Sequence, residues 1–167
     1  NDAIVSNAGG ISAWTQVFPF ISDGNDGFFM AWHDDRDNNN LSSTFVQHIS
    51  ATGEILLGDN GTEASTMIGR HNFYPFLGLT SGSDDIFVYW NEMDGDQNNR
   101  GIYGQKISAA GERLWTDNGK SIIELSSKNV YPFSASQTEE DVIVFYEEYF
   151  DVVDSKVKAM RLDTDGE

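Results

Sequence analysis

Cysteine is absent from the 167 residues of the chain. This absence excludes disulfide bonds, thiolate zinc sites, iron–sulfur clusters and cysteine nucleophiles. Basic residues are scarce, with 10 lysines and arginines against 27 aspartates and glutamates, which gives a net charge of −17 with histidine neutral. A surface this negative repels phosphate backbones and anionic bilayers. We therefore expect no nucleic acid among the partners.

Long hydrophobic runs are also missing. No apolar stretch approaches the ~20 residues that a membrane-spanning helix needs, so we expect no membrane insertion. Hydrophobic residues still make up 39% of the chain and aromatic residues 13%, enough to bury a core. The first residues include neither an initiator methionine nor a basic-then-apolar signal peptide, so we expect a processed chain or a segment of a longer polypeptide.

An internal repeat is the strongest pattern in the sequence. The three prolines all lie in aromatic-Pro-Phe triplets, at Phe18-Pro19-Phe20, Tyr74-Pro75-Phe76 and Tyr131-Pro132-Phe133. A polar turn and an apolar run follow each triplet, and the runs end at Trp32, Trp90 and Tyr146. A Gly-Glu pair then begins 21, 21 and 20 residues later, at Gly53, Gly111 and Gly166. Such regular spacing indicates repeated supersecondary units.

Each repeat is predicted to contain four short antiparallel strands. The segments are rich in β-branched and aromatic residues and are bounded by Gly, Asp, Asn and Ser, and no amphipathic helix is evident. Sheets of about four strands that repeat every 40 to 60 residues are typical of β-propeller blades. We therefore predict an all-β, propeller-like fold of about three blades. Trp32, Trp90 and Tyr146 are its equivalent core positions, and Gly53, Gly111 and Gly166 its equivalent turn positions.

The repeat also predicts the organisation of the chain. We expect a partial strand or lead-in over residues 1–15 and a first blade over 16–70. A second blade follows over 71–128 and an incomplete third over 129–167. A closed propeller usually needs at least four blades. We therefore expect these three to be part of a larger ring, completed by the rest of a longer polypeptide or by other protein subunits.

The repeat resembles a known family at this level of detail. The pattern Trp32-x-Asp34-x-Arg36, with Phe45-x-Gln47 after it, is similar to the propeller-type repeats of bacterial secreted and cell-surface proteins, and the second copy continues it through Trp115 and Gly119. The second copy has Glu92 and Asp94 where the family has Asp and Arg, and the third copy has no arginine there. The resemblance implies an exported protein, extracellular or at the cell surface, and it fixes no ligand.

Two acidic loops are candidate calcium sites. Asp35, Asp37 and Asn39 in the first copy, and Asp94, Asp96 and Asn98 in the second, place oxygen atoms at alternate residues. This spacing lets a tight loop wrap a hard cation such as Ca²⁺. The alternative is a solvated acidic turn, since Asp and Asn favour turns. No other cofactor is indicated.

Three aromatic residues that fall outside the repeat pattern are candidate ligand contacts. They are Trp14, Tyr149 and Phe150. Aromatic rings offer apolar faces to the C–H groups of sugars, so a glycan is a candidate partner. We predict a noncatalytic scaffold or recognition module that binds glycan or protein. The alternatives are part of a propeller glycoside hydrolase or lyase, which would need two suitably spaced carboxylates, and a structural spacer in an adhesin.

Overall fold

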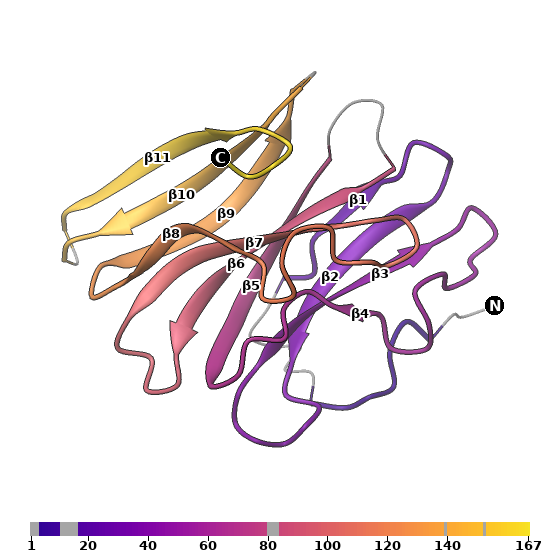
Figure 1. Ribbon diagram of the computed structural model, residues 1–167, viewed down its shortest axis with the longest axis horizontal. Coiled ribbons are helices and arrows are strands. Elements are labelled where there is room, and N and C mark those ends of the chain that lie inside the picture. Colours follow the sequence, from indigo (N-terminus) through magenta and orange to yellow (C-terminus); the bar gives the residue numbers. More distant parts are fainter. Residues whose placement is uncertain (1–3, 11–16, 80–83, 139, 152) are drawn as a thin grey trace.

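The computed structural model describes residues 4–10, 17–79, 84–138, 140–151 and 153–167. Within these ranges the regular secondary structure is β-strand, so the prediction of an all-β fold is confirmed. The strands form three antiparallel sheets that lie side by side in chain order (Figure 1). In the same ranges, no helix is long and apolar enough to cross a membrane.

Each sheet is a meander in which strands that are consecutive in the chain pair with each other. The first sheet contains β1 (Phe20–Ser22), β2 (Phe28–Asp34), β3 (Ser43–Ile49) and β4 (Thr62–Glu63). The second contains β5 (Arg70–Leu79), β6 (Ile86–Asp94), β7 (Arg100–Ile107) and β8 (Lys120–Ser126). The third has three strands in the described ranges, β9 (Asn129–Gln137), β10 (Val142–Tyr149) and β11 (Ser155–Leu162).

The fourth strands of the first two sheets begin late, well after the turn glycines Gly53 and Gly111. Leu57 and Trp115 lie in the loops that precede β4 and β8 rather than within these strands. The delay has a physical cause, because the backbones of Gly61 and Gly119 adopt φ angles of 72° and 75°. A left-handed residue ends an extended segment, so the strands start only after these glycines.

The second sheet is buried on both faces. The side chains of Ile86, Val88 and Trp90 on β6 pack into a core shared with the first sheet. The alternating residues Phe87 and Tyr89 pack into a core shared with β10 of the third sheet. Because successive side chains of a strand point to opposite faces, a strand covered on both sides must be apolar at nearly every position. The continuous apolar run of β6 has this origin.

The aromatic residue that ends each apolar run occupies the same place in its sheet. Trp32 lies opposite Phe45, and Trp90 lies opposite Tyr103. Both tryptophans are buried, and Tyr146 is buried in the third sheet. A Cβ atom on Gly61 would lie 2.8 Å from Cη2 of Trp32 and 2.5 Å from the carbonyl oxygen of Val46. The recurring Asp-Asn-Gly turn therefore needs glycine, because the backbone passes directly over the indole ring.

The three turn glycines close equivalent turns. The φ angles of Gly53, Gly111 and Gly166 are 83°, 86° and 81°. The amide of each glycine donates to the carbonyl three residues earlier, on Ser50, Ser108 and Asp163 respectively. This left-handed backbone is a conformation that glycine adopts at little cost.

Adjacent sheets interlock at these glycines. A Cβ atom on Gly111 would lie 3.2 Å from Cδ2 of Leu57, and one on Gly166 would lie 2.8 Å from Cη2 of Trp115. In both cases, the large apolar side chain four residues after one turn glycine rests against the turn glycine of the next sheet. We refer to this packing as the turn-glycine contact. The turn of the first sheet lacks it, since a Cβ atom on Gly53 would meet nothing within 4 Å.

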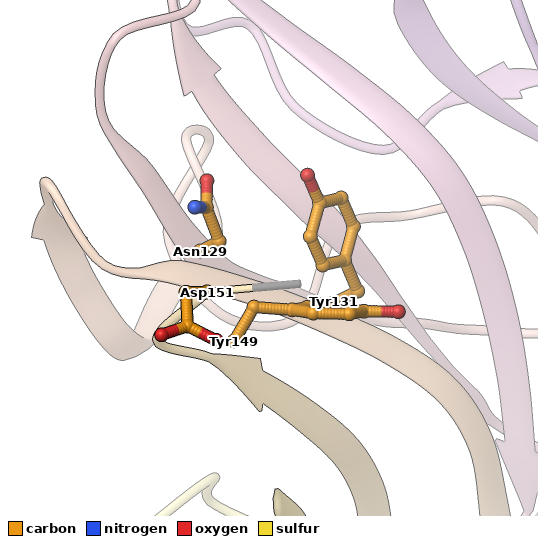
Figure 2. A pocket seen from close by; sticks show the side chains of 4 residues that line it. All are labelled: Asn129, Tyr131, Tyr149 and Asp151. Carbon is orange, nitrogen blue, oxygen red and sulfur yellow. The ribbon is translucent and has the colours of Figure 1, made fainter. Parts of the chain in front are cut away.

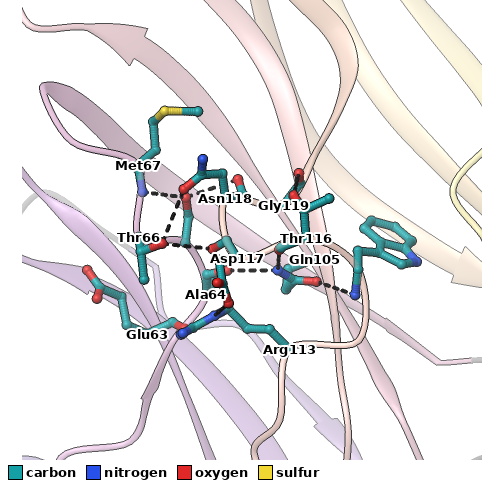
Figure 3. Close-up of polar contacts among 12 residues, drawn as sticks. Glu63, Ala64, Thr66, Met67, Gln105, Arg113, Thr116, Asp117, Asn118 and Gly119 are labelled. Atoms are coloured by element: carbon teal, nitrogen blue, oxygen red, sulfur yellow. Dashed lines mark hydrogen bonds and ion pairs between the residues drawn. The ribbon is translucent and has the colours of Figure 1, made fainter.

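Hydrogen bonds reinforce the junction between the first two sheets (Figure 3). Thr66 donates its amide to the carbonyl of Asp117 over 3.0 Å and its hydroxyl to Oδ1 of Asn118 over 3.1 Å. Arg113 donates to the carbonyl of Glu63 over 3.0 Å. The end of the first sheet's fourth strand is thus bonded to the loop before the second sheet's fourth strand.

Two glycines in the loop before β4 provide a matched test of this close packing. Gly58 and Gly61 share a left-handed backbone, with φ angles of 74° and 72°, but a Cβ atom on Gly58 would meet nothing within 4 Å. Gly58→Ala carries the backbone cost alone, whereas Gly61→Ala adds a clash with Val46. We expect Gly61→Ala to lower the free energy of unfolding by about 1 to 3 kcal/mol more than Gly58→Ala. Urea denaturation of both variants measures the difference, and equal losses would contradict the packing described.

Candidate functional site

A buried carboxylate lies two residues after the recurring aromatic residue in all three sheets. Asp34, Glu92 and Glu148 are 1%, 1% and 4% exposed. A buried carboxylate is costly unless it is paired and hydrogen-bonded. Both catalytic acids and the carboxylates of structural ion pairs can be buried in this way. The hydrogen-bond and ion-pair partners of each carboxylate indicate which role it has.

In the first sheet, Asp34 is part of a closed polar network. Its carboxylate accepts hydrogen bonds from the indole Nε1 of Trp32 and from Nε and Nη2 of Arg36, each over 2.8 Å. The guanidinium also donates to the carbonyl of Asn60 over 3.2 Å and lies over the ring of Phe45, with Cζ 3.3 Å from the ring centroid. Arg36 thereby covers the buried edge of the sheet, which is a structural role.

In the second sheet, a cation from a different strand compensates the carboxylate only in part. Glu92 accepts hydrogen bonds from Nε1 of Trp90 over 2.6 Å and from the amide of Asn72 over 2.7 Å. Nη1 of Arg70, on β5, lies 3.6 Å from its other oxygen. Burial raises the pKa of Glu92 to about 7, although the donors and Arg70 oppose the shift. Glu92 is therefore close to half-protonated at neutral pH.

In the third sheet, two lysines pair with the carboxylate. Lys158 on β11 bonds to Glu148, and Nζ of Lys128 lies 3.4 Å from its other oxygen. The hydrogen bond from Lys158 holds the pKa of Glu148 below its usual range. Lys158 breaks the apolar alternation of its strand, and its bond to Glu148 accounts for that departure. The aromatic-x-carboxylate pair thus recurs in every sheet, while the cation comes from a different position each time.

The two candidate calcium loops are held by hydrogen bonds to their own backbone. Oδ1 of Asp94 accepts from the amides of Asn98 and Asn99 over 2.7 and 3.2 Å. The two carboxylate oxygens of Asp35 accept from the amides of Asn39 and Asn40 over 2.9 and 3.0 Å. The four remaining predicted ligand side chains are exposed: Asp37, Asn39, Asp96 and Asn98. In the described ranges no group of three or more His, Asp or Glu side chains could hold a metal ion.

An open pocket lies at one end of the third sheet (Figure 2). Its volume is about 460 Å³, and it is lined by Asn129, Tyr131, Tyr149 and Asp151. The two tyrosine rings meet edge to face, with centroids 5.6 Å apart and an interplanar angle of 87°. The guanidinium of Arg100 lies over the ring of Tyr131, with Cζ 5.4 Å from the ring centroid, and Nε of Arg100 donates to Oδ1 of Asn129 over 3.0 Å. The pocket therefore combines aromatic faces with an amide and a carboxylate.

The pocket includes one of the three aromatic residues singled out from the sequence. Tyr149 lines it and is 38% exposed. A hydrogen bond to Glu147 raises the pKa of the Tyr149 phenol, which keeps it protonated as a donor. Phe150 is 51% exposed but is not part of the lining, and Nζ of Lys156 lies 4.8 Å from its ring centroid. Trp14 lies outside the described residues.

Sequence reasoning missed the other residues of the pocket. Tyr131 belongs to a repeated triplet, so its pattern indicates a repeated structural position. Tyr131 reaches the pocket because the register of the β9–β10 pair shifts between Phe145 and Tyr146. In the second sheet, the corresponding shift of the β5–β6 pair lies at Tyr74 itself. Asn129 and Asp151 carry no signal of their own in the sequence, since Asn and Asp are common in turns.

Comparisons with known proteins give one informative likeness. No family model matches the chain, and no curated protein matches it. The fold is similar to the crystal structure of an N-acetylgalactosamine deacetylase from F. plautii in complex with blood group B trisaccharide. The TM-score is 0.51 at 12% sequence identity, and the likeness covers 91% of this chain and 44% of that one. The chain thus spans less than half of that protein's length, and the likeness shows the fold alone.

The raised pKa of Glu92 gives a pH-dependent stability. Because the folded state binds the Glu92 proton more tightly than the unfolded state, the stabilisation that Glu92 contributes is fully present below about pH 4.5 and is lost as the pH rises through about 7. We expect the free energy of unfolding to fall by up to about 3 kcal/mol between pH 5 and 8. Glu92→Gln flattens this dependence, and the exposed Glu54→Gln leaves it unchanged. Urea denaturation across the range measures it, and an equal slope in Glu92→Gln would contradict the assignment.

Calcium binding by the two acidic loops stays a prediction of the sequence. A bound ion stabilises the folded chain by mass action, so wild-type protein should melt at a higher temperature in millimolar calcium than in chelator. The increase should be smaller in Asp94→Ala, because that variant loses one of the two loops. If the melting temperature is the same in calcium and in chelator at equal ionic strength, the loops do not bind calcium and are hydrogen-bonded turns only.

Proposed function

We propose that the chain is a noncatalytic scaffold and recognition module of an exported bacterial surface protein, in which the three sheets are blades of a β-propeller-like ring. One observation carries the proposal: the same sheet-to-sheet packing occurs twice along the chain. Leu57 against Gly111 and Trp115 against Gly166 are the same contact between successive sheets. Repeated units joined by a constant rotation are typical of propellers. The exported location rests on the resemblance of the repeat to those of bacterial surface proteins.

The outer face of the first sheet supports a ring of more than three blades. Phe28 is 37% exposed, whereas Ile86 and Val142, at the equivalent places on β6 and β10, are 0% exposed. Phe20 is 77% exposed, whereas Leu77, which holds the same register in the second sheet, is 6% exposed. Large side chains that are buried in the two internal junctions are therefore open to solvent on the first sheet. Exposed apolar patches of this kind mark interaction surfaces.

The pocket of the third sheet supports recognition of a glycan. Tyrosine faces can stack on the C–H groups of a sugar ring, and the Asn129 amide and the Asp151 carboxylate can bond to its hydroxyl groups. Ligand sites commonly combine aromatic walls with a few polar groups of this type. The chain's net charge of −17 favours neutral over anionic sugars as ligands.

The setting of the buried carboxylates supports the noncatalytic part of the proposal. A glycoside hydrolase needs a carboxyl group with a raised pKa beside the bound sugar. Glu92 has such a pKa, but it is 1% exposed and hydrogen-bonded to Trp90 and Asn72. Its shift therefore results from packing within the sheet and does not favour a catalytic role.

A glycan array that includes blood group B trisaccharide, the sugar in the deacetylase complex, tests the recognition site. We expect a neutral glycan to bind. Tyr149→Ala should weaken its affinity about tenfold, the effect of losing one stacking ring. Tyr74→Ala is the matched control, because Tyr74 is 41% exposed, close to the 38% of Tyr149, but lies outside the pocket. An array without binding, or equal binding by wild type and Tyr149→Ala, would contradict the proposal.

A further inference from the structure

Two polar side chains of the pocket in the third sheet are each held by contacts that leave one atom for a ligand (Figure 2). The first is the amide of Asn129, whose Oδ1 accepts from Nε of Arg100 over 3.0 Å. The second is the carboxylate of Asp151, whose Oδ1 accepts from the backbone amides of Val153 and Asp154 over 2.8 and 2.9 Å. Among the residues that the structure describes, Nδ2 of Asn129 and Oδ2 of Asp151 have no hydrogen-bond partner.

The chemistry of Arg100 decides which atom of Asn129 remains. A guanidinium group only donates hydrogen bonds, whereas a side-chain amide has an oxygen that accepts and a nitrogen that donates. The oxygen of Asn129 must therefore face Arg100, and the nitrogen is left as a donor. Nη1 of Arg100 also donates to Sδ of Met93 over 2.7 Å, and the guanidinium lies over the ring of Tyr131. These contacts hold Arg100 in place, so it can set the orientation of the amide.

The junction between the first two sheets shows what the contact of Arg100 adds. Ser42 and Arg100 both stand three residues before the residue that lies opposite the buried tryptophan of their sheet. His71 and Asn129 both lie opposite the residue that follows the buried glutamate. In the first junction, the backbone amide of Ser42 donates to Nδ1 of His71 over 3.3 Å. The equivalent contact between sheets therefore needs no arginine, and what Arg100 adds is the orientation of Asn129.

We propose that Arg100 is a positioning residue of the pocket, and that the pocket selects ligands whose hydroxyl groups accept from Nδ2 of Asn129 and donate to Oδ2 of Asp151. The inference rests on the proposed recognition of a glycan and states which chemical groups of the glycan are read. A sugar hydroxyl can do both, because its oxygen accepts and its hydrogen donates. A carboxylate or sulfate group has no hydrogen to donate to Asp151, and an ammonium group has no lone pair to accept from Asn129. Anions are in addition repelled by the Asp151 carboxylate.

Holding both groups before the ligand arrives favours this selection. A side chain that must be ordered on binding costs affinity, so groups that are already held contribute more. Asn129 is exposed, and without Arg100 its amide could turn either atom to the ligand. With the amide reversed, its oxygen and the Asp151 carboxylate would present two acceptors and no donor. Loss of the Arg100 contact should therefore weaken the binding of a hydroxyl ligand.

Arg100→Met tests the positioning role, with blood group B trisaccharide as the probe. Methionine places a methyl group where Nε of arginine stands, so the stem stays and the donor is lost. We expect the affinity to fall about three- to tenfold, the net effect of one hydrogen bond, and Arg100→Lys, which keeps a donor-only group, to recover part of it. Arg113→Met is the matched control and should bind as the wild type does, because Arg113 also bonds across a sheet junction, to Glu63, but lies outside the pocket. Equal affinity in Arg100→Met and wild type would overturn the positioning role.

Asp151→Asn tests the acceptor. The two backbone amides that bond to Oδ1 still require an oxygen, so the new side chain turns its nitrogen to the ligand and the pocket presents two donors. We expect the preference for blood group B trisaccharide over sialyllactose, a sugar with a carboxylate group, to fall about tenfold. Asp163→Asn is the matched control, because Oδ1 of Asp163 accepts from the amides of Asp165 and Glu167 in a similar turn outside the pocket. An unchanged preference in Asp151→Asn would overturn the inferred ligand class.

NMR relaxation of the side-chain amide nitrogen of Asn129, measured in the sugar-free protein, separates positioning from a general loss of structure. We expect this amide to be ordered in the wild type and in Arg113→Met, and mobile on the picosecond-to-nanosecond timescale in Arg100→Met. Equal order in the wild type and Arg100→Met would overturn this inference alone, whatever the glycan array shows. An array without binding would contradict the proposed function, and the ligand class inferred from it, so the two failures are distinguishable.

Discussion

The contact between a large side chain of one sheet and the turn glycine of the next sets the arrangement of this molecule. Leu57 meets Gly111, and Trp115 meets Gly166. Each contact requires a left-handed turn without a Cβ atom on one side and an apolar side chain on the other. Because the apolar residue follows the turn glycine by four residues in both the first and the second sheet, each of these sheets is joined to the next in the same way.

The buried carboxylate of each sheet has a cation beside it, and that cation comes from a different position in each repeat. The carboxylate two residues after the aromatic residue is kept in every sheet, because it receives the indole donor in the first two and lies buried in all three. Its cation comes from Arg36, Arg70 or Lys158, on three different elements. Different cations can therefore meet the electrostatic requirement of a buried carboxylate, although Arg70 does so only in part, since the pKa of Glu92 stays raised. The second and third sheets lack the expected Asp-Arg pair, but each places a cation from another position beside the buried carboxylate. The same sheet therefore forms in all three repeats.

The sequence was sufficient to predict strands and repeats because hydrophobic alternation and turn glycines are local signals. It could not predict which cation reaches Glu92, since Arg70 stands 22 residues earlier on a neighbouring strand. The pocket was predicted only at Tyr149. Tyr131 joins it through a register shift in β9, and register shifts of this kind depend on the packing of the whole sheet. The place of residues 4–7 likewise became visible only from the hydrogen bonds of Ser6 and Asn7 to Asn60.

A double-mutant cycle between Trp115 and Gly166 tests the turn-glycine contact most directly. Gly166→Ala places a methyl group against the indole, whereas in the Trp115→Ala background that space is empty and only the backbone cost remains. The two changes should therefore be less damaging together than the sum of their separate effects, by at least about 1 kcal/mol in the free energy of unfolding. Effects that add to within about 0.5 kcal/mol would show that the two residues do not touch, which would contradict the sheet-to-sheet packing described.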